Sequence, residues 1–286
     1  MEWGLSNTLL YPGSQPMALD VNGDQSLDLL YQTATDGIKV ALGSLELSTA
    51  FVEEDFFSNF VLTADQNPDC KTPNTSDLIS IPNSNAFIDL NGDCLQEIVL
   101  TRQGSTNTYY EIYSQVLVGG QARYCLAAQN GQLVAPNDVR SGTTTAAPMP
   151  LIELADFNRD GMTDLAFASE TGVLTILYNQ FTAPGPKSTN LCNDVENTSD
   201  LKYKRIFPEF PFSANQNGVT QIKLNTTDAV TYKGIADSMP SATSLPSVPG
   251  RLRVADVDMD GYIDILMTLR FQNETSNFTR STILLN

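Results

Sequence analysis

Four short stretches of the sequence carry acidic or amide side chains at alternate positions, an arrangement that suits a hard cation. Numbered from its first aspartate, each stretch has Asp at position 1, Asn or Asp at position 3, Asp at position 5 and an acid at position 9. A curled loop turns every second residue inward, so these side chains can surround one ion, and Ca²⁺ takes about six to eight oxygen ligands. Position 7 varies in residue type, as expected where only its main-chain carbonyl binds.

The sequence therefore predicts up to four Ca²⁺ sites in loop 1 (20–28), loop 2 (89–97), loop 3 (156–164) and loop 4 (256–264). The predicted ligands are Asp20, Asn22, Asp24, Ser26 and Asp28; Asp89, Asn91, Asp93, Leu95 and Glu97; Asp156, Asn158, Asp160, Met162 and Asp164; and Asp256, Asp258, Asp260, Tyr262 and Asp264. Two carboxylates about 5 Å apart repel by about 3 kcal/mol at an effective dielectric near 20, so converging acids without a cation would protonate or splay. The alternative, acids that merely solvate a turn, suits a single loop better than four loops with one spacing.

The residues around the loops predict strands rather than helices. An EF-hand requires a glutamate at position 12 and a helix on each side, but position 12 is Tyr31, Leu100, Phe167 or Met267. Short apolar runs rich in β-branched and aromatic residues flank every loop, and such runs are typical of strands. Glycine at position 4 in loops 1 and 2, or at position 6 in loops 3 and 4, supplies the backbone freedom of a tight turn.

The spacing of the loops predicts a repeated β fold. Successive first aspartates are 69, 67 and 100 residues apart. A unit of this size, with one metal loop, a strand pair and further strands, fits one four-stranded blade of a β-propeller. We therefore expect an all-β propeller of at least four blades over residues 1–286, rather than a β-sandwich or a parallel β-helix. The short fourth unit favours part of a larger propeller over a closed four-bladed ring.

The longest interval contains an insertion at about 181–250, rich in Pro, Ser, Thr and Asn. Within it, residues 201–212 (LKYKRIFPEFPF) place basic beside aromatic side chains in an otherwise acidic chain. This segment is either a partner-binding surface or an ordinary pair of blade strands with a long connection.

Composition argues against several classes of function. The chain has 33 acidic and 16 basic residues, a formal charge of −17, and so lacks the basic face that a nucleic-acid partner requires. It contains no histidine, which excludes imidazole acid–base catalysis and Ser-His-Asp or Cys-His nucleophiles. Four bound Ca²⁺ would reduce the formal charge from −17 to −9. We therefore do not expect an enzyme.

The cysteines and the chain ends give weaker indications. Cys70, Cys94, Cys125 and Cys192 are either free thiols or disulfides in one of three pairings. Met1 to Gly4 lack the features of a signal peptide, and no apolar run is long enough to span a membrane. Sequons for N-glycosylation begin at Asn74, Asn197, Asn225, Asn273 and Asn277, about the number expected by chance.

The acidic loops resemble the FG-GAP (VCBS-like) repeats of integrin α-chain propellers. A closer resemblance is to the T-cell immunomodulatory protein family, in residues 81–90 with Tyr110 to Tyr113 and in DVDMDGYID at 256–264. The resemblance implies a cell-surface or secreted glycoprotein with an extracellular propeller of about seven blades. Family members carry a signal peptide and a C-terminal membrane helix, so the parent protein is expected to be membrane-anchored, whereas this segment inserts in no membrane.

The favoured function is a non-catalytic, extracellular or lumenal module whose Ca²⁺-stabilised propeller binds a protein or glycan. Extracellular modules often bind Ca²⁺ with dissociation constants of about 10⁻⁴–10⁻³ M. Such sites are saturated outside cells and empty in resting cytosol. The alternative is the propeller part of a metal-dependent hydrolase or lyase, in which carboxylates hold a metal-activated water. A calcium buffer or sensor is disfavoured, because propeller blades have no evident bistable element.

Overall fold

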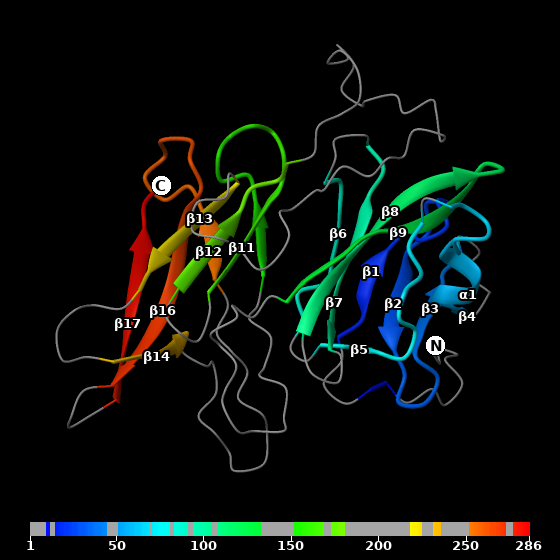
Figure 1. The fold of residues 1–286 in the computed structure, drawn as a ribbon, viewed down its shortest axis with the longest axis horizontal. Helices are drawn as coiled ribbons and strands as arrows, with labels where there is room; N and C mark the ends of the chain where they lie inside the picture. The colour runs from blue at the N-terminus through cyan, green and yellow to red at the C-terminus, as the bar shows by residue number, and fades with distance from the viewer. Residues whose placement is uncertain are drawn as a thin grey trace. The chain divides into compact units, whose positions relative to one another are not determined.

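The strands predicted on either side of the four acidic loops are present, and they build four small antiparallel sheets (Figure 1). The computed structural model describes residues 10–11, 15–44, 51–68, 70–80, 83–90, 94–103, 108–132, 152–168, 173–180, 218–224, 231–235, 252–272 and 277–286. The described residues up to Asn130 belong to one compact unit, and those from Gly131 onwards belong to a second.

The first sheet of the first unit, blade 1, follows the order of the chain. Its strands are β1 (Met17–Leu19), β2 (Asp28–Gln32), β3 (Ile38–Leu42) and β4 (Val52–Asp55), each paired with the next. Leu30, Ile38 and Val40 are at most 1% exposed, so burial of their side chains stabilises the two central strands. The β2–β3 turn passes through Gly37, whose φ of 85° suits glycine.

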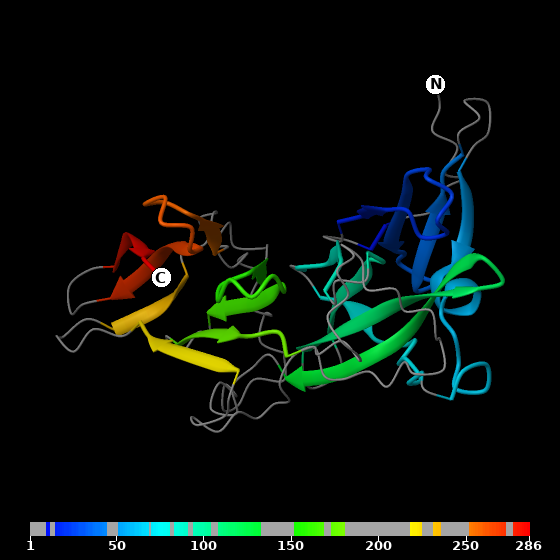
Figure 2. The same ribbon diagram turned by 90° about the horizontal axis from the view of Figure 1, so that it is seen from above.

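The second sheet, blade 2, is wider. Its strands are β5 (Leu78–Ile79), β6 (Ala86–Ile88), β7 (Glu97–Gln103), β8 (Thr108–Val118) and β9 (Gln121–Gln132). Both β5 and β6 pair with one edge of β7, and β8 pairs with the other. Strands β8 and β9 form a long hairpin (Figure 2). Its turn contains Gly119 and Gly120 with φ of 61° and 82°, which suits a two-residue hairpin turn.

A short helix, α1 (Phe56–Phe60), follows β4 and was not part of the all-β prediction. Asp55 caps it, because its Oδ1 accepts a hydrogen bond from the Ser58 amide at 2.8 Å. Phe56 and Phe60 are buried, so the helix packs against the core of the first unit. Five residues are too few for a helical period to appear in the sequence.

A disulfide joins Cys70 to Cys125 of β9. The segment between α1 and β5 lies along β9, since the amides of Leu62 and Lys71 donate to the carbonyls of Tyr124 and Leu126 at 2.8 and 3.1 Å. Cys94 is also disulfide-bonded, and Cys192 lies outside the described residues. Of the alternatives that the sequence left open, the structure thus favours disulfides.

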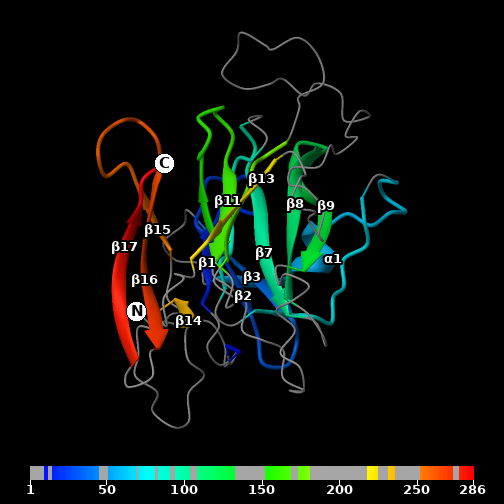
Figure 3. The ribbon, with the colours of Figure 1, turned by 60° about the vertical axis from the view of Figure 1, so that its left-hand side comes forward.

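The second unit contains two further sheets. Blade 3 consists of β10 (Glu153–Ala155), β11 (Asp164–Ala168), β12 (Val173–Leu177) and β13 (Val219–Lys223). Blade 4 consists of β14 (Thr231–Ile235), β15 (Arg253–Ala255), β16 (Asp264–Gln272) and β17 (Asn277–Leu284). Both β14 and β15 pair with β16, and β17 pairs with it along its length (Figure 3). Strands β13 and β14 lie within the stretch 181–250, whereas the basic and aromatic segment 201–212 lies outside the described residues.

Each unit has a core of its own. In the first, Leu19, Val21, Phe56, Tyr124 and other buried side chains of blades 1 and 2 share one cluster. In the second, apolar residues of blades 3 and 4 share another. The prediction of an all-β protein built from the small antiparallel sheets of a β-propeller is confirmed. Among the described residues, no helix combines the length and apolar character needed to cross a membrane.

Candidate metal-binding loops

Each acidic loop connects two neighbouring strands of one blade. Loop 1 joins β1 to β2, loop 2 joins β6 to β7, loop 3 joins β10 to β11, and loop 4 joins β15 to β16. In all four, the residue before position 1 pairs with the acid at position 9: Leu19 with Asp28, Ile88 with Glu97, Ala155 with Asp164, and Ala255 with Asp264. The antiparallel pairing therefore closes each loop at the same register.

The acid at position 9 is buried in every loop. Asp28, Glu97 and Asp164 are 0% exposed and Asp264 is 1% exposed. One carboxylate oxygen of each accepts a hydrogen bond from the amide at position 2, at 2.7 to 2.9 Å. A buried acid without partners would be costly, and these amides supply partners. The position 9 acids thus anchor the loop backbone to the blade.

The second oxygen of three of these acids reaches the end of the next hairpin. The amides of Gly43, Asn179 and Asn286 donate to Asp28, Asp164 and Asp264 at 2.8, 2.8 and 3.0 Å. A Cβ on Gly43 would lie 2.2 Å from the Leu27 carbonyl oxygen, so this close approach requires glycine. Sequence reasoning assigned position 9 to the cation and missed this second role. Each oxygen has a further lone pair, so both roles are compatible.

The acid at position 1 shapes the loop from inside. Asp20 accepts hydrogen bonds from the amides of Gly23, Asp24 and Gln25 at 2.8, 3.1 and 2.8 Å. Equivalent bonds to Asp156 and Asp256 recur in loops 3 and 4. The position 5 carboxylate in turn accepts from the amide at position 7. Three loops therefore share one backbone frame.

This frame places positions 4 and 6 in the left-handed region. Position 4 has φ of 78°, 62° and 63° at Gly23, Arg159 and Met259. Position 6 has φ of 65°, 65°, 85° and 86° at Gln25, Cys94, Gly161 and Gly261. The sequence indicated this conformation only where glycine stands, so the residues of other types were missed.

The donor atoms of loop 4 fit a hard cation. One carboxylate oxygen from each of Asp256, Asp258 and Asp260 lies within 4.8 Å of the others. Asp256 is half-buried and the other two are exposed, so the group opens to solvent. Carboxylate oxygens are ligands that Ca²⁺ prefers, and Asp256, Asp258 and Asp260 at positions 1, 3 and 5 could hold it here.

Loops 1 and 3 carry Asn at position 3. The Nδ2 of Asn22 donates to Asp24 at 2.9 Å and that of Asn158 donates to Asp160 at 3.0 Å. The amide oxygen of Asn is also a hard ligand, so both loops keep an oxygen at positions 1, 3 and 5. In loop 2, Asp89 accepts from the Cys94 amide at 2.9 Å, while Asn91 and Asp93 lie outside the described residues.

Burial dominates the ionisation of the anchoring acids in loops 1 and 3. It raises the pKa of Asp28, and the nearby Asp24 and Asp20 carboxylates add to the effect against hydrogen bonds from Gly43 and Val21 that lower it. Burial likewise raises the pKa of Asp164 to about 6. A bound cation would oppose both effects by favouring the charged carboxylates.

Loops 3 and 4 touch one another. The Arg159 guanidinium carbon lies 4.6 Å from the centre of the Tyr262 ring, within cation–π range. The Asn286 side chain donates to the carbonyl of Phe157 at 2.7 Å. No sequence pattern indicated either contact, although Arg159 does place a basic side chain inside an acidic loop.

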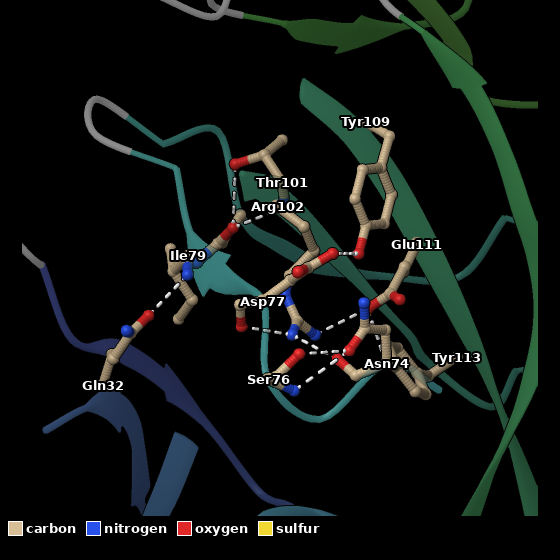
Figure 4. A network of polar contacts seen from close by, with 11 residues as sticks. Gln32, Asn74, Ser76, Asp77, Ile79, Thr101, Arg102, Tyr109, Glu111 and Tyr113 are labelled. Atoms are coloured by element: carbon tan, nitrogen blue, oxygen red, sulfur yellow. Dashed lines mark hydrogen bonds and ion pairs between the residues drawn. The ribbon is translucent and has the colours of Figure 1, made fainter. Parts of the chain in front are cut away.

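A separate polar network lies inside blade 2 and links β7, β8 and residues 74–77 (Figure 4). Arg102 and Glu111 are both fully buried, and Arg102 Nη1 lies 2.7 Å from Glu111 Oε2. Arg102 Nη2 donates to the carbonyls of Asn74 and Asp77. These bonds hold residues 74–77 against the β7–β8 pair.

Comparison with known proteins gives two curated relatives, both named T-cell immunomodulatory protein homolog. One, from Plasmodium yoelii yoelii, is 27% identical over 216 residues, covering 67% of this chain and 26% of the relative. The other, from Plasmodium falciparum (isolate 3D7), is 24% identical over 278 residues, covering 92% of this chain and 34% of the relative. This chain thus spans a quarter to a third of their length, and the resemblance to this family is confirmed. No protein-family model and no solved structure matches the chain.

Proposed function

We propose that this chain is a non-catalytic β-propeller segment whose four loops bind Ca²⁺ and whose surface binds a protein or glycan outside the cell. The observation that carries the proposal is the convergence of Asp256, Asp258 and Asp260 on a loop frame that recurs in the chain. At 4.8 Å, two carboxylates repel by about 3.5 kcal/mol at an effective dielectric near 20. Bound Ca²⁺ converts this repulsion into attraction, so it stabilises the blade.

The disulfide supports the extracellular part of the proposal. Bonds such as Cys70–Cys125 persist in oxidising compartments and are rare in the cytosol. The same compartments supply Ca²⁺ at concentrations that saturate weak sites. An extracellular or lumenal setting therefore suits both features of blade 2.

The anchoring acids support a structural rather than a catalytic role. Asp28, Asp164 and Asp264 each accept two hydrogen bonds from backbone amides, so their carboxylates hold the loop to the blade. The names of the two relatives describe immunomodulatory proteins and mention no reaction. An immunomodulatory binding role for the parent protein therefore extends the proposal better than hydrolysis.

Thermal unfolding with and without Ca²⁺ tests the calcium sites. At about 2 mM Ca²⁺ and dissociation constants of about 10⁻⁴–10⁻³ M, each site stabilises the folded state by about 0.7–1.8 kcal/mol, or about 3–7 kcal/mol for four sites. We expect Tm in 2 mM Ca²⁺ to exceed Tm in EDTA by several degrees, and Asp260→Asn to reduce the difference, since position 5 is Asp in all four loops. Asp65→Asn makes the same charge change at an exposed position outside the loops and is the matched control. An identical Tm in Ca²⁺ and EDTA would refute the proposal.

A further inference from the structure

We propose that Tyr124 is a positioning residue of the loop 1 calcium site, its buried hydroxyl holding a water of the ion's coordination shell. This inference rests on the proposed function. Tyr124 is 0% exposed, and its hydroxyl has no hydrogen-bond partner within the part of the chain that the structure describes. A buried polar atom without a partner is rare in folded proteins and calls for a water, an ion or another group that completes it.

The packing of β9 brings Tyr124 to loop 1. Alternate residues of a strand share one face, so Ala122, Tyr124 and Leu126 face the same way, and all three are buried. The Ala122 Cβ lies 3.7 Å from the point that a Cβ on Gly23 would occupy, so this face of β9 passes directly beside loop 1.

Tyr124 also shares a core cluster with the residues on either side of Asp20. These two residues are Leu19 and Val21. Its ring lies 6.3 Å from that of Phe56, which fixes the apolar part of the side chain in the core. The ring is thus fixed in the core, and the hydroxyl is the one polar atom of the side chain.

Electrostatics agrees with this placement. Burial is the main reason that the pKa of Tyr124 is raised, and the carboxylates of Asp20, Asp28 and Glu97 raise it further. The hydroxyl is therefore within electrostatic reach of the acids at positions 1 and 9 of loop 1 and of the acid at position 9 of loop 2.

The hydroxyl has the chemistry that such a position needs. Ca²⁺ takes about six to eight oxygens, more than the five that loop 1 supplies singly, so water completes the shell. A coordinated water directs its hydrogens away from the ion, and a tyrosine oxygen can accept one of them. Groups that orient metal ligands in this way change metal affinity by about 10- to 100-fold when removed.

Tyr124→Phe tests the inference, because it removes the hydroxyl and keeps the ring. In EDTA we expect Tm to stay level or rise, since an unpaired polar atom has been deleted. In Ca²⁺ titrations followed by calorimetry we expect one site to weaken by about 10-fold and the Ca²⁺-induced rise in Tm to shrink. Tyr110→Phe is the matched control, a buried tyrosine of β8 whose pKa is raised by burial alone. It should leave every Ca²⁺ affinity unchanged.

A double variant assigns the effect to loop 1. If Tyr124 acts through the ion of this loop, the losses of affinity caused by Asp20→Asn and Tyr124→Phe will not add in the combined protein. Equal Tm changes in EDTA and Ca²⁺ with unchanged affinities would refute the role of Tyr124 and leave the calcium sites standing. A wild-type chain whose Tm does not depend on Ca²⁺ would instead refute the proposed function and this inference together.

Discussion

Replacing Arg102 by methionine would leave a buried carboxylate without its cation. Arg102 and Glu111 face one another across β7 and β8, and both side chains are 0% exposed (Figure 4). Methionine fills much of the same volume but supplies no charge and no donors. Glu111 would retain the hydroxyl of Tyr113, which donates to it at 2.7 Å. That bond supplies no positive charge, so it is a poor substitute for the ion pair.

The structure sets the size of the effect. Arg102 donates to Glu111 at 2.7 Å, to the Asn74 carbonyl at 2.9 Å and to the Asp77 carbonyl at 2.5 Å. Removing one partner of a buried ion pair costs about 3–5 kcal/mol, because the remaining charge stays desolvated. Residues 74–77 also lose their attachment to β7. We therefore expect the free energy of unfolding to fall by about 3–5 kcal/mol.

Urea denaturation of the disulfide-intact chain in Ca²⁺ measures this loss. Arg102→Met with Glu111→Leu removes both charges and should recover much of the stability, as hydrophobic replacement of whole buried pairs often does. Arg123→Met is the matched control, since Arg123 is partly exposed. It hydrogen-bonds Gln121 and Ala122 and lies 5.9 Å from the centre of the Phe60 ring. Its replacement should cost less than about 1 kcal/mol. A loss below about 1 kcal/mol for Arg102→Met would show that Glu111 is not held as a buried charge.

Two further predictions concern the disulfide and pH. Replacing Cys70 and Cys125 by serine opens a loop of 55 residues. This should lower the free energy of unfolding by up to about 4 kcal/mol, measured by urea denaturation against the oxidised chain. An unchanged midpoint of urea denaturation would contradict this prediction. In EDTA, Asp164 has a folded pKa of about 6, above its ordinary value, so its contribution to stability is full below about pH 4 and is lost as pH rises through 6. Tm between pH 4.5 and 7.5 should therefore fall more steeply with pH in the wild type than in Asp164→Asn, and parallel curves would exclude a raised pKa.

The sequence predicted the features that repeat. Strands flank every loop as expected, because the apolar runs around Asp20 and Asp256 are short and rich in β formers. The blade unit followed from the spacing of the loops alone. Strands β13 and β14 were missed within the stretch 181–250, because polar, turn-forming residues surround them and no metal loop marks them.

The remaining details depend on contacts that no local pattern records. An acid at position 9 is expected both where it binds a cation and where it accepts hydrogen bonds from buried backbone amides. The sequence alone therefore could not predict the hydrogen bonds that Asp28 accepts from the amides of Val21 and Gly43. The left-handed backbone conformation of Arg159 could not be predicted, because in a sequence glycine is the residue that indicates this conformation. The pairing of Cys70 with Cys125 required the fold, since three connectivities suit four cysteines.

In each loop the acid at position 9 holds the loop to its blade, and the acid at position 1 shapes the turn. These two roles limit how much stability a bound cation can add. Buried Asp264 ties loop 4 to its blade through backbone amides, and Asp256 closes the turn through Gly261 and Asp260. The frame is thus held by hydrogen bonds of the chain itself, and under the proposed function Ca²⁺ would neutralise the acidic cluster that this frame gathers. Under the proposed function, each site then adds a modest increment, and four sites in one chain make the sum large. Loss of one loop would weaken the propeller, whereas chelation would affect every blade at once.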